Sequence, residues 1–221
     1  MNKNIIVAID GPVGSGKSTV AKFLAAKLGF LYIDTGAMYR AVTLKVMRNN
    51  IELTNTEKIA KLAQDTDIKL VQQNNKLHVY LDNEDVSEAI RAPEVSRNTS
   101  PVCDIKDVRK RLVALQQEMG NGGNIVMEGR DISTVVFPQA KKKFYLDASL
   151  DERAKRRFLE LQNKGFKITL EEVKKDIITR DERDKTRELG ALKKHPDAVI
   201  IDSTSISPED VVNKMFDIVL K

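Results

Sequence analysis

The chain has 221 residues, 41% hydrophobic and 31% charged, which is enough for one folded unit with a sizeable core. Lys and Arg outnumber Asp and Glu by 37 to 32, but these charges are interspersed and Trp is absent, so we expect a phosphorylated small molecule as partner and no nucleic acid. The single cysteine, Cys103, excludes an intramolecular disulfide and a thiol cluster for zinc.

The first apolar run, Ile5–Ile9, stops at Asp10. It is too short for the core of a signal peptide, and no run in the sequence approaches the roughly 18 apolar residues of a membrane helix. We therefore expect a cytoplasmic protein with no membrane partner. We also expect a monomer, because nothing in the sequence demands a second copy.

A glycine-rich loop lies between this run and a helical pattern over Val20–Leu28. The spacing Gly-x-x-x-x-Gly-Lys-Ser is typical of a P-loop, in which backbone N–H groups surround phosphate oxygens. We expect Lys17, in a solvent-facing loop, to reach the β- and γ-phosphates, and Ser18 to bind Mg²⁺. The predicted ATP site comprises Gly11, Gly14, Ser15, Gly16, Lys17, Ser18 and Thr19, with Mg²⁺ as cofactor.

The P-loop does not identify the reaction, since ATPases, GTPases and small-molecule kinases share it. Four later apolar runs alternate with helical patterns, which predicts an α/β fold with a five-stranded parallel sheet flanked by helices. These runs are Leu31–Ile33, Ile125–Met127, Phe144–Leu146 and Val199–Ile201. Ser207 is predicted to cap the last helix, with Pro208 in its first turn.

Two segments interrupt this alternation. Apolar and polar residues alternate over Asp67–Gln72 and Lys76–Leu81, around a turn at Gln73-Asn74-Asn75, and a third short run follows near Asp85-Val86. They predict a small antiparallel insert at about 64–104, followed by helical stretches around Pro93–Ser100 and Lys106–Met119 that return to the sheet.

A highly charged segment at about 151–190 predicts two helices joined near Gly165, with Thr169 and Glu172 forming a capping box. Beside a P-loop, such an arginine-rich hairpin indicates a lid over the ATP phosphates, whereas a merely solvated helical pair is the alternative. Of its first arginines, Arg153, Arg156 and Arg157, we expect one to face ATP and select Arg157.

Several arginines occupy places that suit phosphate binding. Arg40 and Arg130 each follow a predicted strand, and open α/β sheets bind ligands at the carboxyl ends of their strands. Arg180, Asp184 and Arg187 share one face of a helical pattern, although intrahelical salt bridges such as Arg180–Asp184 are the alternative. Transfer from one phosphate to another needs such cations and no general base, because the attacking oxygen is already anionic.

Six strings, in this order and spacing, resemble those of bacterial-type cytidylate kinases: IDGPVGSGKST, LGFLYIDTGAMYRA, IRAPEVSRNTS, GRDISTVVFP, LQNKGF and RDERDKTR. The resemblance covers essentially the whole chain. It implies a single domain over 1–221 with the P-loop nucleoside-monophosphate-kinase fold, a CMP-binding insert and a lid. The activity that it implies is phosphate transfer from ATP to CMP or dCMP.

The resemblance also implies roles for individual residues. Arg40 and Arg130 would hold the acceptor phosphate, and Thr35 and Tyr39 would line the same pocket. Ser100, Arg109, Asp131 and Arg187 would surround the cytosine, and Arg180 with Asp184 would bind the ribose. Lys17, Arg130, Arg180 and Arg187 would be the catalytic residues.

Three positions depart from the commonest family pattern: Glu128 replaces Asp, Ser133 replaces Gly and Ala191 replaces Pro. The change at Ser133 leaves the local backbone open. Two rival functions also stay open. One is a related kinase that phosphorylates UMP, AMP or shikimate. The other is a P-loop switch or nucleic-acid-stimulated ATPase, in which Asp34 or Glu128 would hold Mg²⁺.

Overall fold

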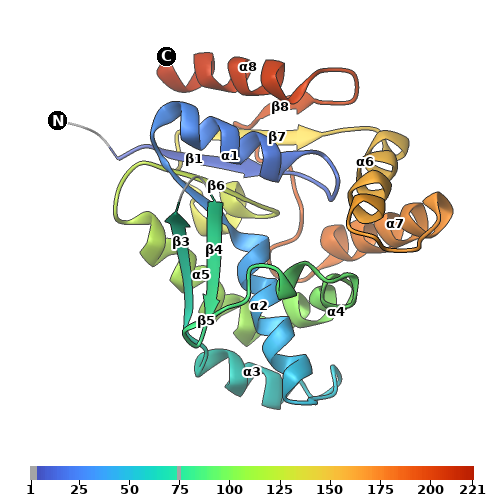
Figure 1. Ribbon diagram of the computed structural model, residues 1–221. Helices are drawn as coiled ribbons and strands as arrows, with labels where there is room; N and C mark the ends of the chain where they lie inside the picture. Colours follow the sequence, from blue (N-terminus) through green and yellow to red (C-terminus); the bar gives the residue numbers. More distant parts are fainter. Residues whose placement is uncertain (1–3, 74–75) are drawn as a thin grey trace.

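The computed structural model describes residues 4–73 and 76–221 and contains a central parallel sheet (Figure 1). The strands pair in parallel in the order β2-β6-β1-β7-β8. The five predicted apolar runs all become strands of this sheet, which confirms the predicted fold class. The strands are β1 (Ile6–Asp10), β2 (Leu31–Asp34), β6 (Ile125–Gly129), β7 (Lys142–Asp147) and β8 (Val199–Asp202).

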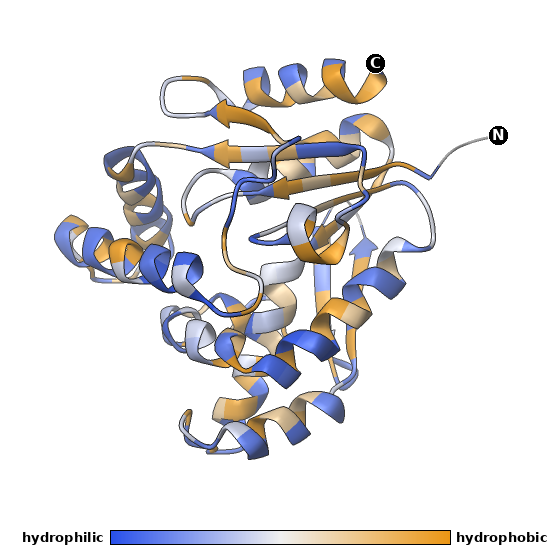
Figure 2. Cartoon of the chain, turned by 180° about the vertical axis from the view of Figure 1, so that it is seen from behind, coloured by the Kyte–Doolittle hydropathy of each residue, from blue (hydrophilic) through white to orange (hydrophobic). Residues whose placement is uncertain are grey.

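Helices cover both faces of the sheet because its strands are apolar on both sides. Val7 and Ile9 pack in a cluster with α1 (Lys17–Leu28) and α8 (Pro208–Leu220). Ala8, between them, belongs to the opposite cluster, where α5 (Lys106–Gly120) packs. Figure 2 shows the hydrophobic colour following the strands through the interior. As predicted, Ser207 caps α8 and Pro208 is its first residue.

A second core lies under the sheet in the view of Figure 1, where α2 and α5 pack with the insert. Its small antiparallel sheet is confirmed, with Ile68 opposite Leu81, and residues 74–75 of the predicted turn lie outside the described residues. The elements here are α2 (Thr35–Arg48), α3 (Thr56–Gln64), β3 (Ile68–Gln73), β4 (Lys76–Leu81), β5 (Glu84–Asp85), the 3₁₀ turn η1 (Ala89–Arg91) and α4 (Pro93–Asp104).

Helix α4 continues four residues beyond the helical stretch predicted from the sequence. Pro101 removes one backbone donor and usually ends a helix. The helix nevertheless runs on to Asp104, with Val102 and Cys103 buried against the second core. Packing therefore outweighs the local preference at this position. The extension has a functional consequence, since it brings Asp104 close to the candidate site.

Helices α6 (Leu150–Asn163) and α7 (Leu170–Thr186) form a helical arm at the right of Figure 1. The arm has its own small core around Leu161 and Val173, and the predicted capping box at Thr169 and Glu172 is present. Arg153 fastens the arm to the P-loop, since its Nη1 donates to Asp181 at 2.7 Å and to the Val13 carbonyl at 3.1 Å.

Asp10, at the end of β1, holds the turn that follows β6. The Asp10 carboxylate accepts from the backbone N–H of Ile132 and of Ser133 at 2.8 Å each, and from the Ser133 hydroxyl at 2.5 Å. Burial raises the pKa of Asp10, while these three donors favour its ionised form. Ser133 lies in a right-handed π-helical turn, η2 (Ile132–Val136), so the local backbone does not require glycine there.

We predict that Asp10→Asn destabilises the protein, because the amide group presents a donor to buried donors. The expected loss in the free energy of unfolding is about 1–3 kcal/mol. Ser133→Ala removes one hydrogen bond of the three and is expected to cost about 1 kcal/mol. Urea unfolding of both variants measures the difference, and equal stability of Asp10→Asn and the wild type would contradict this account.

Candidate active site

A cavity of about 950 Å³ opens at the carboxyl ends of the parallel strands, between the sheet, α4 and the helical arm. Its walls include every site residue predicted from the sequence except Gly11. Gly11 lies behind the cavity, where a Cβ atom would stand 2.0 Å from the Leu146 carbonyl oxygen. The glycine therefore allows close packing of the loop against β7, which is a different need from contact with phosphate.

The P-loop takes the conformation that its glycines allow. Gly14 and Gly16 have φ of 78° and 88°, in the left-handed region, and α1 begins at the next residue, Lys17. The first N–H groups of α1 therefore point toward the cavity, and the positive end of the helix faces an incoming anion. This is the geometry of a phosphate site.

Lys17 differs from the sequence expectation, because it is the first residue of α1 and is buried instead of solvent-facing. Its Nζ donates to the Pro12 carbonyl at 2.6 Å. Burial, together with the positive charges of Arg130 and Arg180, lowers the pKa of Lys17 to about 7. A phosphate group beside Nζ would supply the negative charge that keeps Lys17 fully protonated.

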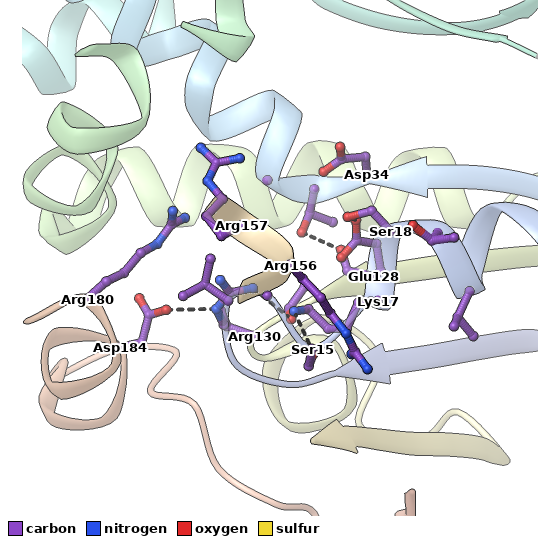
Figure 3. Close-up of a pocket in the computed structure, with 18 of the residues that line it drawn as sticks. Ser15, Lys17, Ser18, Asp34, Glu128, Arg130, Arg156, Arg157, Arg180 and Asp184 are labelled. Atoms are coloured by element: carbon purple, nitrogen blue, oxygen red, sulfur yellow. Dashed lines mark hydrogen bonds and ion pairs between the residues drawn. The ribbon is translucent and has the colours of Figure 1, made fainter. Parts of the chain in front are cut away.

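The carboxylate of Glu128, from β6, lies next to Ser18 of the P-loop (Figure 3). Its Oε1 accepts from the Ser18 hydroxyl at 2.5 Å and from the Tyr32 hydroxyl at 3.2 Å. Burial and the nearby Asp34 raise the pKa of Glu128. Asp34 has another task, since it caps α2 through the Ala37 N–H at 2.9 Å.

A hydroxyl and a carboxylate side by side fit Mg²⁺, which prefers oxygen ligands and usually keeps waters and substrate phosphates in its shell. Within residues 4–73 and 76–221, no cluster of three or more His, Cys, Asp or Glu residues forms a complete metal site. The donor set of Ser18 and Glu128 therefore suits a metal ion that arrives with a nucleotide.

Asp184 lies at the centre of the arginine group. Its ion pairs differ from the intrahelical Arg180–Asp184 salt bridge that was the alternative to a binding role. It pairs with Arg130 at 2.7 Å and with Arg187 at 2.9 Å, and an intrahelical salt bridge to Arg180 is not among the ion pairs of the described residues. Burial would raise the pKa of Asp184, but Arg130, Arg180 and Arg187 lower it to about 2.

Arg180 and Arg187 reach the cavity in different ways. Arg180 projects from α7 with a buried Nε that has no hydrogen-bond partner, and burial together with Arg130 lowers its pKa to about 10 (Figure 3). Arg187 follows the last residue of α7 in extended backbone, with φ −55° and ψ 136°, and is not part of the predicted helical face. Its side chain turns back to meet Asp184.

A group of buried polar side chains from α2, α5 and the turn after β6 forms another part of the cavity wall. Arg109 from α5 and Asp131, just after β6, form a buried ion pair there. The Arg109 guanidinium lies 5.4 Å from the centre of the Tyr39 ring, and the buried Tyr39 hydroxyl has no partner. Burial raises the pKa of Asp131, and Arg109 opposes this shift. Ser100 also lines the cavity.

The arm contributes two arginines to the donor side. Arg157 lines the cavity as expected, and its Nη1 pairs with Glu160 at 2.7 Å. Arg156, which was not selected from the sequence, lines it too and donates to the Ser203 carbonyl at 2.6 Å. Arg156 could not be found from the sequence, because the two arginines are adjacent and only the packing of α6 brings both to the cavity.

We predict that Lys17→Met lowers ATP-dependent turnover by at least about a hundredfold, since it removes the cation at the phosphate site. Stability should stay equal or rise. A lysine whose pKa is lower in the folded than in the unfolded chain costs stability wherever the unfolded lysine is charged. Turnover assays and thermal melts of the two proteins test both statements, and a loss of activity smaller than about tenfold would overturn the assignment.

Within the described ranges, 4–73 and 76–221, the structure contains no helix that has both the length and the apolar character needed to span a membrane.

The cytidylate kinase family model matches residues 7–221. Cytidylate kinase from Caldicellulosiruptor bescii is 48% identical over 219 residues, which cover 99% of this chain and 97% of that protein. Cytidylate kinase from Caldanaerobacter subterraneus subsp. tengcongensis is 49% identical over 221 residues, covering 100% and 97%.

Among solved structures, shikimate kinase from Bacteroides thetaiotaomicron aligns with a TM-score of 0.51 and 14% identity, covering 99% of this chain and 100% of its own. This likeness concerns the fold alone, a P-loop kinase core. The match to the family model and the two close relatives extend over nearly the full length, including the P-loop and the arginine-rich arm. The chain belongs to the cytidylate kinase family.

Proposed function

We propose that this protein transfers the γ-phosphoryl group of ATP to CMP or dCMP, giving CDP or dCDP. The observation that carries the proposal is the continuity of one cavity, which joins the P-loop to the pocket around the buried Arg109–Asp131 pair. The cavity volume of about 950 Å³ is at the upper end of the range for small-molecule sites, as a site for two nucleotides would require. Membership of the cytidylate kinase family supports the choice of acceptor.

The donor half of the site is the P-loop from Gly14 to Thr19 with Lys17 and Arg157. Mg²⁺, when bound with ATP, would neutralise phosphate charge and hold the phosphate oxygens in position. Ser18 and Glu128 would hold this ion. Ser18 and Lys17 are adjacent residues, so in these roles they would act on the same phosphate groups.

The acceptor phosphate needs cations more than it needs a base. Arg40, in the second turn of α2, and Arg130, directly after β6, would hold it in line with the γ-phosphate. The attacking oxygen is already anionic, so the chemical difficulty is the meeting of two polyanions. Arg180 has a buried, unpaired Nε and would stabilise the phosphoryl group during transfer.

The base and the sugar would bind further along the cavity, beside Thr35 and Tyr39. Cytosine presents an amino donor where uracil presents a carbonyl acceptor, and an ionised carboxylate only accepts hydrogen bonds. Asp131 would therefore select cytosine, next to Ser100, Arg109 and Arg187. Asp184 and Arg180 would bind the ribose.

The same proposal assigns CMP binding to the insert at about 64–104 and lid closure to the arm at about 151–190. It describes a cytoplasmic monomer whose partners are ATP and CMP or dCMP. The contact between Ser18 and Glu128 would equally suit a P-loop ATPase. The buried Arg109–Asp131 pair in the same cavity supports a kinase, because an ATPase needs no second polar binding site beside its P-loop.

Arg180 and Arg187 are predicted to matter much more than Arg183. The first two line the cavity, whereas Arg183 is exposed on the same helix and serves as the matched control. Alanine at 180 or 187 should lower kcat/KM for CMP by about a hundredfold or more, while Arg183→Ala should stay within about threefold. Equal small losses at all three positions would favour a purely structural ion-pair role.

An acceptor panel tests the proposed activity and its base selection together. Wild-type protein is assayed for ADP release from ATP and Mg²⁺ with CMP, dCMP, UMP, AMP or shikimate, and we expect CMP and dCMP to be preferred. Asp131→Ala should bring the ratio of kcat/KM for CMP over UMP toward unity, mainly through loss of CMP activity.

Two other outcomes have clear meanings. Preference of the wild type for another acceptor, or ATP turnover stimulated by RNA and not by CMP, would overturn the proposed function. If Asp131→Ala lowers both activities with the ratio preserved, Asp131 serves the phosphate or the metal, and base selection lies with Ser100, Arg109 and Arg187.

A further inference from the structure

Two carboxylates from different parts of the fold hold the guanidinium group of Arg187. Its Nε donates to Oδ1 of Asp104 at 2.6 Å, and its Nη2 donates to Oδ1 of Asp184 at 2.9 Å. Asp184 in turn accepts from Nε of Arg130 at 2.7 Å. A continuous chain of ion pairs therefore runs from the end of α4, through the arm, to the end of β6.

Asp104 and Arg187 differ sharply in exposure. The side chain of Arg187 is 3% exposed, whereas that of Asp104 is 43% exposed. In the part of the chain that the structure describes, the cavity wall includes Arg187 and Cys103 but not Asp104. Asp104 therefore has no direct route to a bound nucleotide and acts on it through Arg187.

Arg187 needs outside support because it lies beyond the regular helix. Its N–H bonds to the Arg183 carbonyl, but its own backbone is extended. A long arginine side chain with one partner keeps considerable rotational freedom, and ordering it costs free energy. Bonds from two nitrogen atoms, Nε and Nη2, fix the orientation of the planar guanidinium and therefore the directions of its remaining N–H groups.

The positive charge of the buried Arg187 also favours contact with both carboxylates. Burial alone lowers the pKa of Arg187, but the neighbouring carboxylates of Asp184 and Asp104 contribute to raising it above its usual value. Asp184 is already shared with Arg130, so it balances only part of the charge of Arg187. Asp104 supplies the second negative charge.

We propose that Asp104 is a positioning residue for the acceptor nucleotide: by holding the Nε edge of Arg187, it orients this arginine toward the base and fastens the end of the arm to α4. The role of Arg187 at the base rests on the function proposed above. The fixed orientation of Arg187 does not, since it follows from the contacts alone.

The kinetic test compares Asp104→Ala with Asp107→Ala, a nearby control whose carboxylate pairs with Lys110 at the surface. Asp104→Ala is expected to raise KM for CMP about fivefold, the effect of losing a partly exposed ion pair, while kcat and KM for ATP change less than about twofold. Asp104→Glu should restore part of the affinity for CMP, and Asp107→Ala should match the wild type.

A second measurement does not depend on the activity. In ¹⁵N spectra, the Nε–H signal of Arg187, assigned by its absence in Arg187→Lys, should exchange slowly with water in the wild type and in Asp107→Ala, and much faster in Asp104→Ala. In the Arg187→Lys background, Asp104→Ala should have no further effect on KM for CMP, since the residue through which it acts is gone.

The outcomes separate this inference from the proposed function. Equal effects of Asp104→Ala and Asp107→Ala on KM and on Nε–H exchange would overturn the positioning role. An equal rise of KM for ATP and for CMP would also overturn it, since it would indicate a general structural effect. Failure of the wild type to phosphorylate CMP would instead overturn the proposed function, while the exchange measurement would still decide whether Asp104 holds Arg187.

Discussion

The mutual repulsion of cations in one cavity is the constraint on which the rest of the site depends. Burial, together with the neighbouring positive charges of Arg130 and Arg180, lowers the pKa of Lys17 to about 7. Such a cluster favours a bound anion, because the carboxylates around it compensate its positive charge only in part. The fold therefore has to hold these groups in place against their own electrostatic preference.

Carboxylates placed between the cations answer this need. Asp184 separates Arg130 from Arg187, Asp34 pairs with Arg40, and Asp131 pairs with Arg109. Each acid orients a cation and reduces repulsion while leaving other donors of that cation free for a ligand. Arg180 is different, since no carboxylate of the described residues forms an ion pair with it and its buried Nε has no partner, so a bound anion would supply its compensation.

Much of the fold and of the candidate site could be predicted from the sequence, because both depend on local patterns. Apolar runs identified every strand of the parallel sheet, and the placement of Arg40 and Arg130 after strands put them at one edge. Features set by tertiary contacts were inaccessible. The lowered pKa of Lys17 depends on its burial and on Arg130 and Arg180, which are distant in the sequence. Arg130 meets Asp184 from a separate element, and Asp104 joins the site only because packing carries α4 past Pro101.

The arm and the P-loop form one mechanical unit, which bears on how a lid would move. A Cβ atom at Gly14 would lie 2.9 Å from Cβ of Arg153, so α6 packs directly on the loop that would hold ATP phosphates. Arg153 donates to the Val13 carbonyl on one side and to Asp181 of α7 on the other. A shift of the P-loop on binding a nucleotide would thus reach α7 through a single buried side chain. Because Arg180 and Asp184 lie on that helix, the contacts of Arg153 physically connect the proposed donor site with groups of the proposed acceptor site.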